Sequence, residues 1–189
     1  MMKYYRKAGG FTLIETMVAV SLLTVAIIAP MSLTSQSLAA AFYARDQVTA
    51  YNLAQEGIEA VRAIRDGQIL QISQNSNASG IDLFGPIPVD QDFIIDSRQS
   101  VPSSAIQSCG GSACPALQTD GTLYGYDPDT SVWLPTHFVR TMHVKYVGAS
   151  HDEIRVAATV SWPTASGQIR SFVISANLYR WVQDGAATP

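Results

Sequence analysis

An apolar run that begins at Phe11 constrains the fold of this chain more than any other feature of its sequence. From there to residue 44 the only charged side chain is Glu15. The run follows three cations, Lys3, Arg6 and Lys7. Residues 11–29 would rise about 28 Å as a helix, close to the roughly 30 Å hydrocarbon core of a bilayer. The sequence therefore predicts a membrane-spanning helix that carries one carboxylate.

That carboxylate and the glycines before the run both indicate a function for the N-terminus. A carboxylate inside hydrocarbon costs about 2.5 to 3.5 kcal/mol on insertion scales, so Glu15 is a functional residue by default. A secretory signal peptide has an apolar core of roughly 7 to 15 residues followed by small residues, whereas here Gly9 and Gly10 precede the run. Cleavage after Gly10 would retain the helix and create an α-amino group at Phe11, about one turn from Glu15. In a helical array, that amine could neutralise the carboxylate of an adjacent subunit.

The basic leader, then Gly10, Phe11, Thr12-Leu13-Ile14-Glu15 and an apolar helix, resembles the N-terminal signal of type IV pilins and type II secretion pseudopilins. The resemblance implies cleavage between Gly10 and Phe11 by a prepilin peptidase, N-methylation of Phe11, and assembly into a filament through the helix, with Glu15 guiding docking. It also implies other pilin subunits and an inner-membrane assembly platform as partners, with membrane lipid around the helix before assembly. The alternative is an ordinary signal anchor with an incidental glutamate.

Charge predicts the compartment and the kind of partner. The formal charge is −3 and the leader, residues 1–10, contributes +3, so the processed chain carries −3 − 3 = −6. This balance gives no basic footprint for DNA, and no nucleic-acid partner is expected. The leader cations predict a cytoplasmic N-terminus for a single-pass inner-membrane precursor. The domain beyond the helix is then expected in the periplasm and afterwards on a cell-surface filament.

The two cysteines suit that oxidising compartment. Cys109 and Cys114 flank a Gly-rich loop, and we expect a disulfide between them worth about 2 kcal/mol. Two free thiols are the alternative, and a zinc site would need more ligands.

Residues 30–66 are expected to form the amphipathic second half of one long helix. Pro30 removes a backbone hydrogen bond, which predicts a kink; the alternative is that it ends the membrane span. In pilins a proline here implies local melting during assembly. Beyond it, apolar and small residues recur at helical spacing in two stripes: Tyr51, Ala54, Ile58 and Val61, and Leu53, Gly57, Ala60 and Ile64. Asp66-Gly67 is expected to end the helix.

Residues 67–135 read as a long variable connection, because Gly, Ser, Asn, Asp and Pro interrupt the periodicity. A connection of this length should contain elements of its own, and short strands are expected near Phe93 to Asp96 and Leu123 to Tyr126. The sequon Asn77-Ala78-Ser79 is expected to carry no glycan, since such three-residue matches are frequent by chance.

Residues 136–182 give the clearest strand signal, and residues 183–189 are a tail. Three alternating runs predict an antiparallel meander whose apolar face covers the helix near Ile58 and Val61. We therefore expect an α+β fold, a long N-terminal helix on a C-terminal antiparallel sheet. The segments Thr136-His137-Phe138-Val139-Arg140, Val160-Ser161-Trp162 and Leu178-Tyr179-Arg180-Trp181 resemble the sheet of PilV-like minor pilins and minor pseudopilins. Arg140 interrupts the apolar face, and is expected either to pair with a carboxylate or loop carbonyls or to extend from the sheet edge to solvent.

The sequence contains no catalytic signature, so no enzyme is predicted. His137, His143 and His151 are expected at the surface without a metal. Asp120, Asp127 and Asp129 are a weak calcium candidate, because oxygen ligands cluster there, but Asp127-Pro128-Asp129-Thr130 is also a favourable turn. No cofactor is otherwise expected. The tryptophans Trp133, Trp162 and Trp181 are expected in the core rather than at a subunit contact.

Together these features predict a structural subunit, a minor pilin, that functions by assembly. The alternatives are a pseudopilin of a type II secretion system and a membrane-anchored periplasmic protein whose acidic loop binds calcium or another ligand. A DNA-uptake pilin is disfavoured by the net charge.

Overall fold

The computed structural model describes residues 9–74, 82–99, 101–129, 131–164 and 166–180. The chain divides into two compact units, residues 1–45 and residues 46–189. The sequon at residues 77–79 and Trp181 lie outside the described residues.

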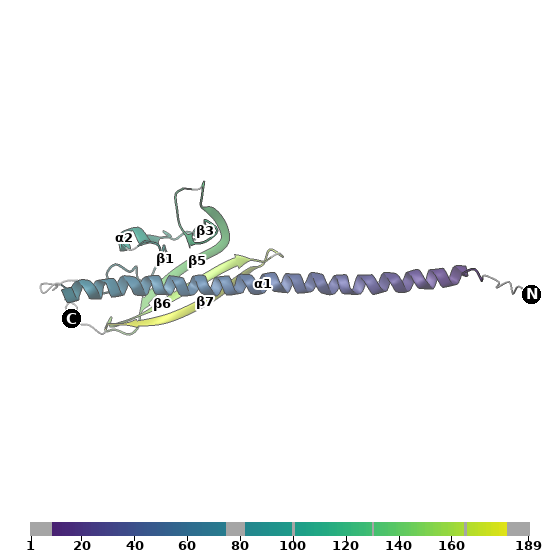
Figure 1. Cartoon of the computed structure of the whole chain (residues 1–189). Coiled ribbons are helices and arrows are strands. Elements are labelled where there is room, and N and C mark those ends of the chain that lie inside the picture. The colour runs from purple at the N-terminus through teal and green to yellow at the C-terminus, as the bar shows by residue number, and fades with distance from the viewer. Residues whose placement is uncertain (1–8, 75–81, 100, 130, 165, 181–189) are drawn as a thin grey trace, which may run out of the picture. The chain divides into compact units, whose positions relative to one another are not determined.

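One long helix, α1, spans Leu13–Gln74 (Figure 1). It continues through Pro30, and the Thr34 hydroxyl donates to the Pro30 carbonyl at 2.9 Å. The expected continuation of the helix beyond Pro30 is therefore confirmed, and the alternative that Pro30 ends the membrane span stays a prediction. Whether the proline bends the helix during assembly stays a prediction.

The expected end of α1 at Asp66-Gly67 is also wrong, because the helix runs on to Gln74. Gly67 costs about 1 kcal/mol relative to alanine inside a helix. The residues after it gain tertiary contacts, since Gln68 is buried and both Ile69 and Ile72 pack against the core. Packing of this kind outweighs local propensity in most protein helices.

The predicted meander is confirmed. Three long strands, β5 (Leu134–Tyr146), β6 (Glu153–Pro163) and β7 (Ile169–Tyr179), pair antiparallel in chain order. Their alternating burial puts Phe138, Met142, Val144, Ile154, Val156, Val160 and Leu178 in the core. The strand β5 begins two residues before the expected start at 136.

The connecting region holds more structure than was predicted. β1 (Asp92–Ile95) and β4 (Tyr124–Gly125) fall where strands were expected. The helix α2 (Pro102–Ala105) and the strands β2 (Ile106–Ser108) and β3 (Ala116–Thr119) were not predicted. Both β1 and β3 pair antiparallel with β5, which extends the meander into one seven-stranded sheet.

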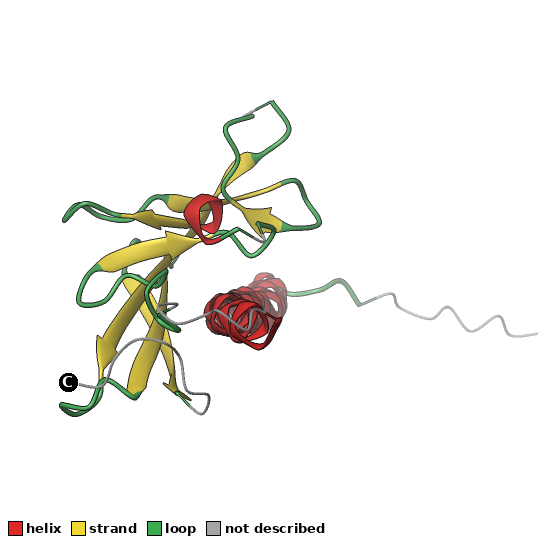
Figure 2. Ribbon diagram, turned by 90° about the vertical axis from the view of Figure 1, so that its left-hand side faces the viewer, coloured by secondary structure: helices red, strands yellow, loops and turns green. Residues whose placement is uncertain are grey.

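The core of residues 46–189 lies between this sheet and the second half of α1. Figure 2 looks along α1 and shows the strands to one side of it. The helix contributes the predicted stripes, with Ala54, Ile58 and Val61 at most 4% exposed. Tyr51 is 43% exposed, but its ring contacts Phe172 edge-on at 5.7 Å. Trp133 and Trp162 are buried, as expected. The fold is thus the predicted α+β architecture of a helix on an antiparallel sheet.

Candidate functional site: the N-terminal segment

The N-terminal segment changes from non-helical chain to helix within a few residues. Gly9 to Thr12 lie outside the helix and are exposed, and α1 begins at Leu13. The backbone N–H of Glu15 donates to the Thr12 carbonyl at 3.1 Å and to the Thr12 hydroxyl at 3.3 Å. The second contact is that of a helix N-cap residue, which satisfies one of the orphan donors of the first turn. Glu15 lies in that first turn, where a carboxylate is favoured by the helix dipole.

The helix that follows presents its apolar side chains outward. Every side chain that the structure describes from residue 11 to 45 is exposed, and Phe11 at 81% and Leu13 at 78% are the most exposed of the large apolar ones. By length and composition, α1 is able to cross a membrane. Contiguous exposed apolar surface of this extent marks a lipid or protein contact rather than a water-facing surface.

Five hydroxyl side chains of this segment are compatible with lipid because the helix backbone satisfies them. The hydroxyls of Thr16, Ser21 and Thr24 donate to carbonyls three or four residues earlier, at 2.8 Å in each case. Thr34 and Ser35 do the same beyond the proline. Unsatisfied polar groups cost several kcal/mol in hydrocarbon, so this local bonding keeps the segment apolar in effect.

Comparison with known proteins agrees with this geometry. The family model described as the prokaryotic N-terminal methylation motif matches residues 5–29. The motif and the helix-on-sheet fold are similar to those of type IV pilins and pseudopilins. No curated protein and no solved structure matches the chain. The motif and the apolar helix are consistent with a membrane-anchored, pilin-like precursor.

In residues 46–189, Arg140 is the buried charge that joins three elements. Its side chain is fully buried, and its guanidinium donates to the carbonyl of Leu53 on α1 at 3.0 Å and to that of Ile95 on β1 at 2.7 Å. Glu56 lies 3.5 Å away. The expected pairing with a carboxylate and a connecting-region carbonyl is confirmed, and the alternative of a solvent-facing arginine is wrong. Arg140 thus tethers the helix and β1 to the centre of the sheet.

A second ion pair organises the connecting region. The guanidinium of Arg98 donates to both carboxylate oxygens of Asp96, at 3.0 and 2.7 Å, contacts Asp127 at 3.2 Å, and lies 4.0 Å from the ring centroid of Trp133. Burial alone would raise the pKa of Asp96. The bonds from Arg98 and the Tyr126 N–H outweigh burial and hold this pKa below its ordinary value.

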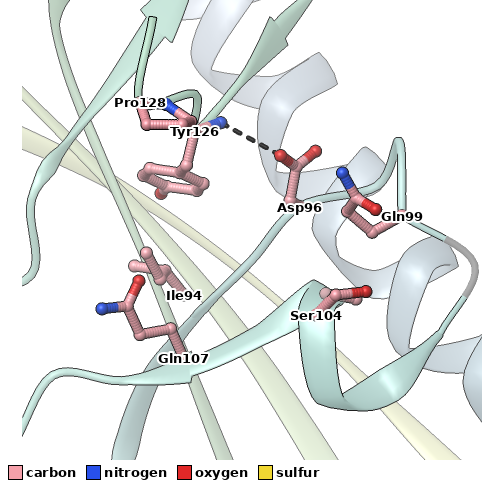
Figure 3. A pocket seen from close by; sticks show the side chains of 8 residues that line it. Ile94, Asp96, Gln99, Ser104, Gln107, Tyr126 and Pro128 are labelled. Carbon is pink, nitrogen blue, oxygen red and sulfur yellow. Dashed lines mark hydrogen bonds between the residues drawn. The ribbon is translucent and has the colours of Figure 1, made fainter.

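A cavity of about 250 Å³ lies beside this ion pair (Figure 3). Its lining combines apolar side chains with uncharged polar groups. The one charged residue of the lining, Asp96, is paired with Arg98. The lining residues are Ile94, Asp96, Gln99, Ser104, Ala105, Gln107, Tyr126 and Pro128. Burial raises the pKa of Tyr126 to about 12, against the opposing effect of Arg140, so its phenol stays neutral. The cavity suits an uncharged polar ligand better than an ion.

The structure does not gather the calcium candidates into one site. Asp120 accepts the N–H groups of Thr122 and Leu123. Asp129 bonds to Ser131, and Asp127 pairs with Arg98. Within the described ranges, no group of three His, Cys, Asp or Glu side chains could hold a metal. Asp129 caps a turn, which agrees with the turn expected at residues 127–130, and Asp120 caps a separate turn.

Two histidines have acidic neighbours that the sequence did not reveal. His143 Nδ1 lies 2.8 Å from Asp92 Oδ1, and His137 Nε2 lies 3.7 Å from Asp46 Oδ2. Both histidines are partly exposed, at 43–45% of the side chain. The carboxylates come from β1 and α1, which are distant from these histidines in sequence. Cys109 and Cys114 are joined by a disulfide.

The sequence contains a signal for the N-cap role of Thr12, which was not among the predicted functional residues. Thr12 and Glu15 have the Thr-x-x-Glu spacing of a capping box, which marks the helix start at Leu13. Arg98 had no comparable signal, because its partners lie up to 29 residues away.

Proposed function

We propose that this chain is a minor pilin, a structural subunit of a type IV pilus-like filament that functions by assembly rather than catalysis. The observation that carries the proposal is the N-terminal methylation motif at the start of an apolar helix whose side chains are exposed through residue 45. Neighbouring copies of the same helix would cover this surface in a filament. Membrane lipid would cover it before assembly.

Each residue of the motif has a role in this proposal. Cleavage occurs between Gly10 and Phe11, and the new α-amine of Phe11 is N-methylated. The Glu15 carboxylate pairs with the α-amine of an adjacent subunit, which sets the register of docking. Pro30 lets the helix deform, since it leaves one backbone carbonyl of α1 without its helical donor. The partners are a prepilin peptidase, other pilin subunits and an inner-membrane assembly platform, with no nucleic acid.

The proposed topology follows from the leader. Lys3, Arg6 and Lys7 keep the N-terminus of the precursor in the cytoplasm. Residues 46–189 then fold in the periplasm, where the Cys109–Cys114 disulfide persists. The PilV-like segments of the sheet favour a minor pilin over a pseudopilin of a type II secretion system.

Substitution of Glu15 tests the docking role. Glu15→Gln keeps the shape of the side chain and removes its charge, so we expect normal membrane insertion and cleavage with little incorporation into filaments; Glu15→Ala should behave in the same way. Glu59→Gln is the matched control, because Glu59 is an exposed glutamate farther along α1 that pairs with Arg62. Immunoblots of sheared filaments and of membranes report the two pools. Normal incorporation of Glu15→Gln would contradict the docking role.

The cavity beside Asp96 supports a second candidate, a membrane-anchored ligand-binding protein. This candidate predicts that an uncharged polar ligand raises the melting temperature of the folded domain, or that calcium does so through Asp120, Asp127 and Asp129. A melting temperature unchanged at millimolar calcium would remove the calcium version.

A further inference from the structure

The peptide bond that cleavage must break lies outside the helix. Gly10 and Phe11 precede the first helical residue, Leu13, and both are exposed. A Cβ atom added at Gly10 would meet no other atom within 4 Å. The scissile carbonyl therefore belongs to non-helical, exposed chain, although it lies only two residues before a 62-residue helix.

The Thr12 side chain opposes extension of α1 toward the N-terminus. To extend α1 by one residue, the Glu15 N–H would have to bond to the Phe11 carbonyl, four residues earlier. To extend it by two, the Ile14 N–H would have to bond to the Gly10 carbonyl, which is the scissile one. In the structure the Glu15 N–H instead donates to the carbonyl and the hydroxyl of Thr12. The Thr12 hydroxyl thus competes for the donor that the first step of extension requires.

We propose that Thr12 is a positioning residue for processing: as the N-cap of α1, it keeps the Gly10–Phe11 peptide outside the helix, in the non-helical form that the peptidase cleaves. This inference rests on the proposed cleavage site. The reaction itself is hydrolysis, in which one water is consumed, the C–N bond breaks, and a Gly10 carboxylate and a Phe11 α-amine form. Thr12 takes no part in that chemistry and acts only on the conformation of the substrate.

The position of Thr12 gives it the same role after cleavage. As the second residue of the processed chain, it still caps Leu13 and the residues that follow. The Phe11 amine then lies before the cap, outside the helix, where a methyl-transferring site can reach it. The Thr12 hydroxyl would thus favour both cleavage after Gly10 and N-methylation of Phe11.

A pair of near-isosteric substitutions separates the hydroxyl from the shape of the side chain. Thr12→Val keeps the β-branched shape and removes the hydroxyl, whereas Thr12→Ser keeps the hydroxyl and removes the methyl. Thr16→Val is the control, because the Thr16 hydroxyl donates to the Leu13 carbonyl at 2.8 Å and caps nothing. Full-length precursor is inserted into membranes, and only the inserted fraction is treated with prepilin peptidase at several precursor concentrations. Initial rates then give kcat and KM.

Loss of the cap should act on KM. If part of the precursor has the scissile peptide in the helix, its apparent affinity falls in proportion to the fraction that remains outside the helix. We expect Thr12→Val to raise KM by at most about five-fold, because a typical N-cap changes the equilibrium between the two forms by about that factor, with kcat unchanged. Thr12→Ser and Thr16→Val should cleave like the wild type. The carbon chemical shifts of Phe11 in micelles should become helical in Thr12→Val alone.

Three results would overturn the inference. Equal KM values for Thr12→Val and Thr12→Ser would show that the hydroxyl is irrelevant. A lowered kcat at unchanged KM would indicate a direct contact with the peptidase rather than positioning. Unchanged Phe11 shifts in Thr12→Val would show that the cap does not limit the helix. Wild-type precursor that is not cleaved at Gly10 would instead refute the proposed function, so the two failures are distinguishable.

Discussion

Two ionisable side chains, Arg140 and Glu15, lie in apolar segments of this chain, and their surroundings are opposite. Arg140 is fully buried and donates to two backbone carbonyls inside its own subunit. Glu15 lies exposed on the first turn of an apolar helix. A buried charge persists only when it is bonded, and Arg140 meets that requirement internally. For Glu15, the proposed assembly supplies the partner from a neighbouring subunit.

Arg140 should therefore matter for stability rather than for assembly. Arg140→Met fills much of the same space but leaves the Ile95 carbonyl without the Arg140 donor, while the Leu53 carbonyl keeps its helical partner. We expect the free energy of unfolding to fall by roughly 1 to 3 kcal/mol, the cost of one unsatisfied buried group. Urea unfolding of residues 46–189, followed by tryptophan fluorescence, measures the change. Arg62→Met, at an exposed helical ion pair, is the control and should change stability by about 0.5 kcal/mol or less.

The Asp96–Arg98 pair predicts an acid dependence of stability. The pKa of Asp96 is lower in the folded protein than in the unfolded chain. Its contribution to stability is therefore fully present above the unfolded pKa of about 3.9 and is lost as the pH falls through the folded pKa. Asp96→Asn should be less stable than wild type at pH 7, and the difference should shrink on acidification. Urea unfolding between pH 7 and pH 2 tests this, and a difference that stays constant with pH would contradict it.

At the scale of elements, the three long strands were predictable, whereas of the short strands only β1 and β4 were. In β5 to β7, inward residues that are mostly apolar alternate with outward residues that are mostly polar, Val139, Ala157 and Val173 being exceptions, so a period of two is still evident. The strands β2 and β3 have three and four residues, too few for a period to appear. Their pairing depends on β1 and β5, which are distant in sequence.

The error at the end of α1 has a similar origin. A glycine such as Gly67 commonly follows the last residue of a helix. The helix continues through it when the residues beyond it can pack against the core. Ile69 and Ile72 pack against the core, and no local sequence pattern predicts the surface against which they pack. Tertiary contact therefore decided the end of the helix.

Two glycines in α1 provide a matched test of how the helix packs. A Cβ atom at Gly57 would lie 2.8 Å from the Met142 sulfur and 3.2 Å from Arg140 Cδ, whereas one at Gly67 would meet nothing within 4 Å. Gly67→Ala should stabilise residues 46–189 by about 0.5 to 1 kcal/mol through helix propensity. Gly57→Leu should destabilise them by about 1 to 3 kcal/mol, because it forces the helix from the sheet. Thermal unfolding of both variants checks the contrast, which equal effects would contradict.

At the scale of the whole molecule, the buried core and the exposed apolar surface belong to different units. All buried apolar residues among those described lie from Ala50 onward, within residues 46–189. The described side chains of residues 11–45 are all exposed. The fold of the second unit is thus complete in one chain, while the first unit needs an apolar environment, which lipid or neighbouring subunits supply.

The candidate site was largely predictable because its chemistry is local in sequence. Gly10, Phe11 and Glu15 fall within six consecutive residues, so the motif can be recognised from residue order and hydropathy alone. The interactions that depend on folding were not predictable, among them the Arg98 contacts and the carboxylates beside His137 and His143. These partners come together only when distant strands pair.

Mass spectrometry of filaments sheared from the native cell tests the central claim most directly. We predict a peptide of this chain that starts at N-methylated Phe11, at an abundance below that of the principal subunit. Such a peptide would establish processing and filament membership together. A chain that remains in the membrane with residues 1–10 attached would contradict the account and favour a plain signal anchor.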